Sequence, residues 1–265
     1  MGLLQSMSGG PQNVLPKIVK VRQEFMHRTA NNKGNSVERT NEMRRLLLFD
    51  FDGTLYRGDE PFRFYAGAIA SRMRKTDRDR YLKAVTAHLT GTRTIEAGDH
   101  WEAVVSLAKP FIPDSRVFQE AFMETRVHMM TDACPLEVPP GVLDFLTRVK
   151  GQVVLAVASN SPDQAARPLL DKLGLTPYFD YIRPEAKKPI GLPGLVHEIM
   201  GADDASHPDR VFSVGDNYRN DIEPARAQGW FTAYINPQGY QPGPSTVVGR
   251  CIEDILPDLQ RWVLQ

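Results

Sequence analysis

From Arg44 onward, short apolar runs alternate with stretches whose apolar residues recur at helical spacing, and this alternation constrains the fold more than any other feature. The apolar runs have the length of buried strands and cover residues 46–49, 153–157, 178–182, 211–214 and 231–235. The helical stretches between them cover residues 141–150, 162–173, 192–200 and 220–228. The pattern predicts an α/β fold, a Rossmann-like parallel sheet with helices on both faces.

One segment interrupts this alternation. Between residues 61 and 134 no convincing strand occurs, and the apolar residues recur at helical spacing. The large apolar residues that can line the inner faces of about four helices are Phe64, Ile69, Tyr81, Val85, Leu89, Trp101, Val104, Leu107, Phe118 and Phe122. We therefore predict a helical cap domain at residues 61–134, inserted after the first strand, and an α/β core domain at residues 43–60 and 135–265.

Residues 1–42 differ in character from the rest of the chain. Residues 8–11 and 31–36 are prone to turns and hold few large apolar side chains, whereas residues 14–27 have apolar positions at roughly helical spacing. We predict a flexible N-terminal extension at residues 1–42. The alternatives are an upstream sequence before a natural start at Met43, and a helix that docks on a partner or a membrane surface.

Global charge does not point to a polyanionic partner. Lys+Arg and Asp+Glu both total 32, so the formal net charge is zero, and neither nucleic acid nor an anionic membrane is expected as a partner. The sequence has no apolar run that could cross a bilayer, no secretory signal, and two cysteines without metal or disulfide spacing. These features predict a cytoplasmic protein, and the sequence is equally compatible with a monomer or a dimer.

Two acidic residues follow directly on the first apolar run, in the sequence Asp50-Phe51-Asp52-Gly53-Thr54. Alternate side chains of an extended segment share a face, so both carboxylates project at the carboxyl end of the strand, where open α/β sheets bind ligands. Two such carboxylates suit a hard cation such as Mg²⁺. The alternative is that Asp50 and Asp52 only cap a turn.

Polar residues also follow the second and third apolar runs. Ser159 and Asn160 end the second run and can donate hydrogen bonds to phosphate oxygens, or else cap the helix that follows. Lys188 precedes Pro189, and a cation there can neutralise phosphate charge, although most lysines are merely solvated. Lys187 is the alternative for this role.

Gly215 and Asp216 follow the fourth apolar run, with Asp221 five residues after Asp216. Asp216 is placed to complete a metal site together with the acids of the first strand. Asp221 can support that site or orient Lys188, and the alternative is that it caps a helix. Polar groups of complementary type thus end four successive buried strands.

As an ordered set, these motifs resemble those of the haloacid dehalogenase superfamily of phosphotransferases, of the C1-capped phosphatase type. The resemblance extends from about residue 43 to the C-terminus and includes the helical insert, which has the place of the family's C1 cap. It rests on Asp-x-Asp-x-Thr at Asp50, on Ser159, on Lys188-Pro189 and on Gly-Asp-x-x-x-x-Asp at Gly215. One departure follows Pro189, because relatives commonly have a second proline sooner than this chain does.

The resemblance implies a role for each residue. Asp50 would attack phosphorus and form an aspartyl phosphate, and Asp52 would protonate the leaving group and later activate water. The phosphoryl group would be bound by Thr54, Ser159, Asn160 and Lys188. Mg²⁺ would be held by Asp50, Asp216 and the carbonyl of Asp52, with Gly215 and Asp221 in support. Asp52 also favours phosphate chemistry, because relatives that displace halide need no acid at that position.

The expected activity is a Mg²⁺-dependent phosphatase that hydrolyses a small-molecule phosphate ester, such as a sugar phosphate, phosphoglycolate or a nucleoside monophosphate. The alternatives are a phosphomutase of the same superfamily and a catalytically idle binding module. Side chains that can select the substrate are Tyr56, Arg57, Arg63, Arg93, His100 and Trp101. Of these, Trp101 is also placed to pack in a helical core.

Overall fold

The computed structural model describes residues 44–93, 95–201, 205–239 and 242–265. Residues from Met43 to Gln265 form one compact unit. The extension predicted at residues 1–42 lies outside the described residues. None of the described helices is both long enough and apolar enough to cross a membrane.

Six parallel strands form a single sheet and confirm the predicted fold class. The strands are β1 (Leu46–Phe49), β2 (Val154–Ala158), β3 (Tyr181–Arg183), β4 (Val211–Gly215), β5 (Phe231–Ile235) and β6 (Val247–Gly249). Their order is β3-β2-β1-β4-β5-β6, so the chain changes direction across the sheet between β1 and β4. Ligands of open α/β sheets bind at the carboxyl ends of the strands beside such a change.

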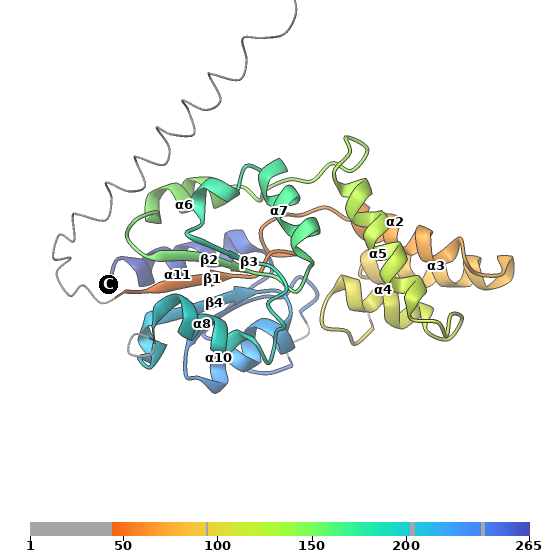
Figure 1. Cartoon of the computed structure of the whole chain (residues 1–265). Helices are drawn as coiled ribbons and strands as arrows, with labels where there is room; N and C mark the ends of the chain where they lie inside the picture. The colour runs from red at the N-terminus through yellow and green to blue at the C-terminus, as the bar shows by residue number, and fades with distance from the viewer. Residues whose placement is uncertain (1–43, 94, 202–204, 240–241) are drawn as a thin grey trace, which may run out of the picture. The chain divides into compact units, whose positions relative to one another are not determined.

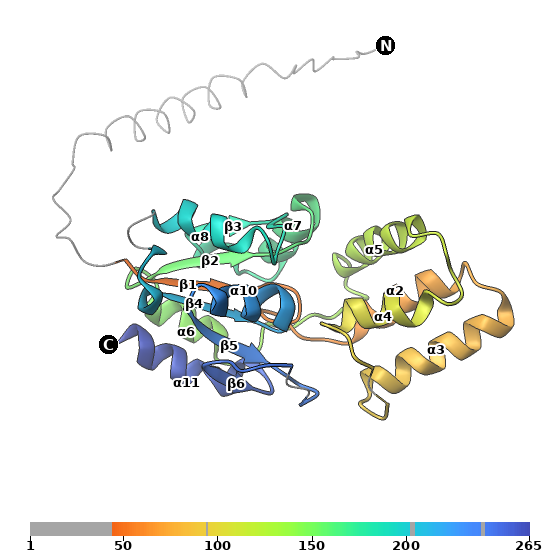
Figure 2. The ribbon, with the colours of Figure 1, turned by 90° about the horizontal axis from the view of Figure 1, so that it is seen from below.

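Alternate residues of the strands enter two separate hydrophobic cores. Leu47 and Phe49 of β1 pack with the helices α6 (Val142–Val149), α7 (Asp163–Lys172) and α11 (Ile252–Val263). Leu46 and Leu48 face the opposite way and pack with α8 (Leu192–Met200) and α10 (Glu223–Ala227). Helices therefore cover both faces of the sheet (Figures 1 and 2), as buried parallel strands require.

In the described residues between β1 and α6, four helices follow one another, namely α2 (Glu60–Ala70), α3 (Lys75–Leu89), α4 (His100–Ala108) and α5 (Arg116–Met129). Their inner faces form a third core around Ile69, Tyr81 and Val104, and the Tyr81 hydroxyl donates to the Val104 carbonyl at 3.1 Å. We call this helical segment the cap. Its predicted boundaries as a separate domain stay a prediction, because residues from Met43 to Gln265 group as one compact unit.

The structure differs from the predicted elements where the backbone forms 3₁₀ or π turns instead of a regular strand or α-helix. A 3₁₀ turn, η2 (Thr176–Tyr178), occupies the start of the predicted third strand, and a second, η3 (Pro208–Arg210), leads into β4. Part of the helix predicted at residues 220–228 is a π-helix, η4 (Tyr218–Ile222), ahead of α10. Two elements were missed: β6, which is only three residues long, and α11, which begins at an uncommon Cys251 cap and contains Pro257.

Candidate active site

The polar residues predicted at four strand ends meet at the carboxyl edge of the sheet, on the side where the cap lies (Figure 1). Asp50 directly follows β1 and Asp216 directly follows β4, so the two acids lie on either side of the change in strand order. Ser159 directly follows β2. Because these loops leave neighbouring parallel strands at one edge, residues distant in sequence share one cavity.

Lys188 is buried between two of the carboxylates. Its Nζ donates to Oδ1 of Asp50 and to Oδ1 of Asp221, both at 2.6 Å. Burial alone would lower the pKa of the Lys188 ammonium, but Asp221 and Asp50 outweigh burial and raise it. Lys187 is exposed, so the structure brings Lys188 and not Lys187 to Asp50.

The side chain of Asn160 fixes the backbone that carries this lysine. Its Nδ2 donates to the Lys188 carbonyl at 3.0 Å, and its Oδ1 accepts from the Lys188 N–H at 2.7 Å. The amide therefore orients the lysine loop, and its predicted role in phosphate binding stays a prediction. Thr54 lies beside Asp50, with Oγ1 3.4 Å from Oδ2 of Asp50, a distance that leaves its hydroxyl able to turn to another acceptor.

Asp52 lies in a different environment from Asp50. Its Oδ1 accepts from the Tyr56 hydroxyl at 2.6 Å and pairs with Nη2 of Arg126, a cap residue on α5, also at 2.6 Å. Its Oδ2 accepts from the hydroxyls of Ser161 at 2.8 Å and Ser159 at 3.3 Å. Burial would raise the pKa of Asp52, but Arg126 and the hydroxyl donors outweigh burial and lower it.

Arg126 and Ser161 were not predicted as site residues. Arg126 is one basic residue among many in the cap, and only the folded position of α5 brings it to Asp52. Ser161 lies two residues after Ser159, and this repeat at a strand end was the available signal. Nη2 of Arg126 donates to Ser161 Oγ at 2.7 Å, so the two missed residues contact each other as well as Asp52.

Three carboxylates gather where a cation would fit. Asp50, Asp216 and Asp221 each offer an oxygen, and these oxygens lie within 4.8 Å of one another. Burial raises the pKa of Asp50 to about 7, despite the opposing charge of Lys188. Burial and the neighbouring Asp50 and Asp99 raise the pKa of Asp216 well above its usual range. A divalent cation would relieve this crowding, and an all-oxygen donor set suits Mg²⁺.

The cluster differs in one member from the predicted metal ligands. Asp221 contributes a carboxylate to it, whereas the Asp52 side chain points to Tyr56, Ser161 and Arg126. Any contribution of Asp52 to a metal would therefore come from its main-chain carbonyl.

Two glycines leave room for the acidic side chains. Gly53 has a φ of +85°, and a Cβ atom there would lie 2.2 Å from Oδ2 of Asp216. A Cβ atom on Gly215 would lie 2.3 Å from Oδ2 of Asp221. Both contacts are far below ordinary van der Waals separation, so a larger residue at either position would displace a carboxylate of the cluster.

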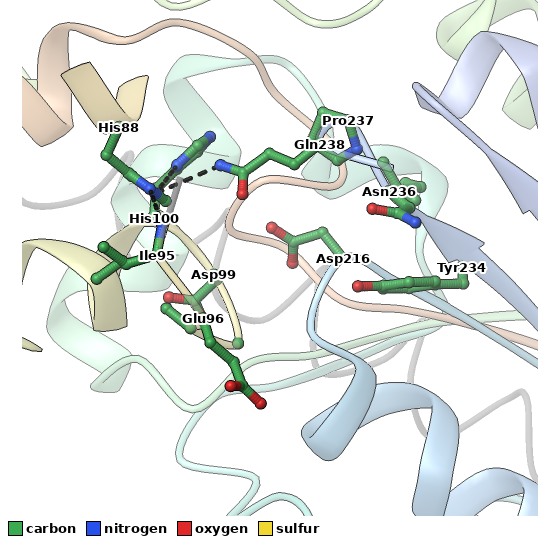
Figure 3. A pocket seen from close by; sticks show the side chains of 13 residues that line it. His88, Ile95, Glu96, Asp99, His100, Asp216, Tyr234, Asn236, Pro237 and Gln238 are labelled. Atoms are coloured by element: carbon green, nitrogen blue, oxygen red, sulfur yellow. Dashed lines mark hydrogen bonds between the residues drawn. The ribbon is translucent and has the colours of Figure 1, made fainter. Parts of the chain in front are cut away.

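A second pocket lies beside Asp216, between the loop ahead of α4 and the loop after β5 (Figure 3). Nε2 of His88 lies 3.2 Å from Nδ1 of His100 and 3.3 Å from Nε2 of Gln238. Asp99 joins the cap to the core here, because its Oδ2 accepts from Nδ2 of Asn217 at 2.7 Å. Burial lowers the pKa of both histidines, which favours their neutral forms.

A cavity of about 710 Å³ lies above Asp50 and Asp52, with the cap on its far side. Cap residues that line it include Tyr65, Trp101, Lys109, Phe118, Phe122 and Arg126.

The other candidates for substrate selection lie elsewhere. His100 lines the second pocket, Arg63 is exposed and pairs with Asp59, and Arg57 is exposed and pairs with Glu137 and Glu253. Arg93 is exposed.

Residues 45–229 match the sequence family of the haloacid dehalogenase-like hydrolases. The chain is 31% identical over 154 residues to phosphoglycolate phosphatase 1 of Pseudomonas aeruginosa, a match that covers 53% of this chain and 52% of that protein. It is 27% identical over 199 residues to a phosphoglycolate phosphatase of Pseudomonas putida, with 70% and 66% covered. The chain thus spans about half the length of the first relative and just under two thirds of the second.

Among solved structures, the fold is similar to that of a haloacid dehalogenase-type hydrolase of Bacillus subtilis that was crystallised with magnesium. The TM-score is 0.57 at 17% sequence identity, and the match covers 82% of this chain and 99% of that one. This likeness concerns the fold.

Proposed function

Because this chain belongs to the haloacid dehalogenase-like hydrolases, we propose that it is a Mg²⁺-dependent phosphatase that uses Asp50 as its nucleophile and Asp52 as its general acid and base. The observation that carries this proposal is the pairing of two acids in opposite environments. Asp50 lies against Lys188 and the carboxylate cluster, whereas Asp52 lies among hydroxyl and guanidinium donors. Lys188 and a bound cation would hold Asp50 ionised for attack, and the hydroxyl and guanidinium donors would hold Asp52 in place as the proton carrier.

In the first step an oxygen of Asp50 attacks phosphorus, and the bond between phosphorus and the ester oxygen breaks as Asp52 gives that oxygen a proton. The product alcohol leaves, and Asp50 carries the phosphoryl group. In the second step water attacks phosphorus, Asp52 accepts a proton from that water, and the bond to Asp50 breaks to release phosphate. The contacts of Asp52 favour its anionic form, which is the form that accepts the proton from water in the second step.

The remaining residues of the site would bind and neutralise the phosphoryl group. Lys188 would hold Asp50 and a phosphoryl oxygen, and the hydroxyls of Thr54 and Ser159 would donate to the other oxygens. Mg²⁺ held by Asp50, Asp216 and Asp221 would supply further charge neutralisation at the phosphoryl group. Phosphoryl transfer depends mainly on such positioning and electrostatic stabilisation.

The substrate we propose is a small-molecule phosphate ester, with 2-phosphoglycolate as the first candidate. The two Pseudomonas relatives are phosphoglycolate phosphatases, and the cavity of about 710 Å³ accommodates a small ester. Sugar phosphates and nucleoside monophosphates are the next candidates. A mutase would use the same aspartyl phosphate but return the phosphoryl group to the substrate.

The test is a phosphate-release assay on a panel that contains an aryl phosphate, 2-phosphoglycolate, sugar phosphates and nucleoside monophosphates, each with Mg²⁺ or with EDTA. We expect inorganic phosphate to accumulate in step with substrate loss, and only with Mg²⁺. Isomerised product without phosphate would assign the site to a mutase instead. A folded protein that consumes no ester would exclude both activities for this panel and leave a binding module.

A further inference from the structure

Charge is distributed unequally around the cavity. Its core side carries the carboxylates of Asp50, Asp52, Asp216 and Asp221, and the Lys188 ammonium is enclosed between two of them. Its cap side carries Arg126, which pairs with Asp52, and the exposed Lys109, among aromatic side chains. A bound metal ion and Lys188 can neutralise the negative charge that one phosphoryl group would add beside these carboxylates. A second anionic group on the substrate would therefore be repelled by the core and attracted to the cap.

Two buried donors on the cap side have no hydrogen-bond partner. In the described part of the chain, the buried side-chain nitrogens and oxygens without a partner are Nε of Arg126 and Nε1 of Trp101. Arg126 is 5% exposed, so water does not readily replace the missing partner. Buried donors are normally paired, and an unpaired one destabilises the fold unless a ligand supplies the acceptor.

The two donors belong to side chains that contact each other and line the same cavity. The guanidinium carbon of Arg126 lies 4.9 Å from the ring centroid of Trp101 and 4.7 Å from that of Phe122. The other end of the guanidinium is held by Asp52 and Ser161 through Nη2. Arg126 is thus fixed from two sides, which keeps Nε in place for an acceptor.

We propose that Arg126 and Trp101 form a carboxylate subsite that selects phosphate esters with a carboxylate on a short carbon skeleton. A carboxylate accepts from several donors at once, so it can bind Nε of Arg126 while Nη2 stays on Asp52. The skeleton must be short, because Nη2 of Arg126 lies 2.6 Å from Asp52, the residue that serves the ester oxygen. This inference rests on the proposed phosphatase activity and adds to it the residues that would recognise a carboxylate on the substrate.

The test compares 2-phosphoglycolate with ethyl phosphate, which has a methyl group in place of the carboxylate. We measure kcat/KM for both esters in the native protein and in two variants. Trp101→Phe keeps an aromatic ring but removes the Nε1 donor. Arg126→Lys keeps the positive charge but removes the Nε donor. The native protein should prefer 2-phosphoglycolate by about tenfold or more. Each variant should lower this preference by about three- to tenfold.

The matched control is Trp262→Phe, the same substitution on α11 at a tryptophan whose Nε1 donates to the Asp209 carbonyl. It should leave the preference unchanged. Because Trp101→Phe removes a contact to the carboxylate, it should lower kcat/KM for 2-phosphoglycolate more than kcat/KM for ethyl phosphate. If the role of Trp101 were purely structural, Trp101→Phe would lower kcat/KM for both esters by the same factor.

Equal kcat/KM for the two esters in the native protein would overturn the subsite, and so would a native preference that persists in either folded variant. Both results would leave the phosphatase activity standing, because ethyl phosphate would still be hydrolysed. If the native protein hydrolyses neither ester nor any other ester with Mg²⁺, the proposed function fails and the subsite fails with it.

Discussion

At the scale of single residues, the site depends on two aspartates that lie two positions apart and have opposite electrostatic surroundings. Burial raises the pKa of Asp50 to about 7, whereas Arg126 and the hydroxyl donors overcome burial at Asp52 and lower its pKa. The sequence predicts that both residues lie at the end of β1, because their spacing fixes a common face. It does not predict the difference in pKa, because Arg126 on α5 lies more than seventy positions after Asp52 in the chain.

Gly53 offers a test of how closely the carboxylates pack. We expect Gly53→Ala to weaken Mg²⁺ binding by about 10- to 100-fold, because the added Cβ would lie 2.2 Å from Oδ2 of Asp216 and would displace it. Calorimetric titration with Mg²⁺ measures the affinity. The control is Gly67→Ala on α2, where a Cβ atom meets nothing within 4 Å. Equal Mg²⁺ affinities in the two variants would mean that Asp216 does not hold the metal.

At the scale of elements, regular periodicity predicted most of the sheet and the helical character of the cap. The runs at residues 46–49 and 231–235 became β1 and β5 with the same bounds. β6 and α11 escaped prediction, because a three-residue strand carries no period and Pro257 within a helix argues against one. The contacts between cap and core could not be predicted from periodicity either, because they depend on how the cap helices pack against the sheet domain.

Asp99 caps the start of α4 and also forms a hydrogen bond between cap and core. Its Oδ1 accepts from the Glu102 N–H at 2.7 Å at the start of α4, and its Oδ2 accepts from Asn217. We expect Asp99→Ala to lower the free energy of unfolding by about 1–2 kcal/mol, as measured by urea denaturation. Ser115→Ala is the control, because Ser115 occupies the cap position of α5 without a side-chain hydrogen bond. Equal losses in the two variants would contradict this role of Asp99.

At the scale of the whole molecule, the carboxylate cluster links stability to pH and to metal. The pKa of Asp50 is raised from 3.8 in the unfolded chain to about 7 in the fold, so the folded state holds the proton more tightly. The stability that this group contributes is present below pH 3.8 and is lost as pH rises through about 7. A bound cation requires the deprotonated carboxylates and restores stability where the proton is absent.

Thermal unfolding should therefore respond to Mg²⁺ according to pH. We expect the increase in Tm on adding Mg²⁺ to be larger at pH 7.5 than at pH 5.5, because at the lower pH protons compete for the carboxylates. In EDTA, the Tm of the native protein should fall between pH 5.5 and pH 7.5, and Asp50→Asn should make this fall smaller. An increase in Tm that is the same at both pH values would mean that Mg²⁺ does not bind at the buried cluster.

The nucleophilic role of Asp50 is tested most directly by an assay of phosphate release with Mg²⁺ that compares the native protein, Asp50→Asn and a control variant. The control is Asp163→Asn, because Asp163 is an exposed acid on α7 that pairs with Arg167. We predict that Asp50→Asn lowers kcat by at least about a thousandfold while remaining folded, and that Asp163→Asn stays within about twofold of the native protein. A folded Asp50→Asn protein that keeps a tenth or more of the native rate would contradict the mechanism.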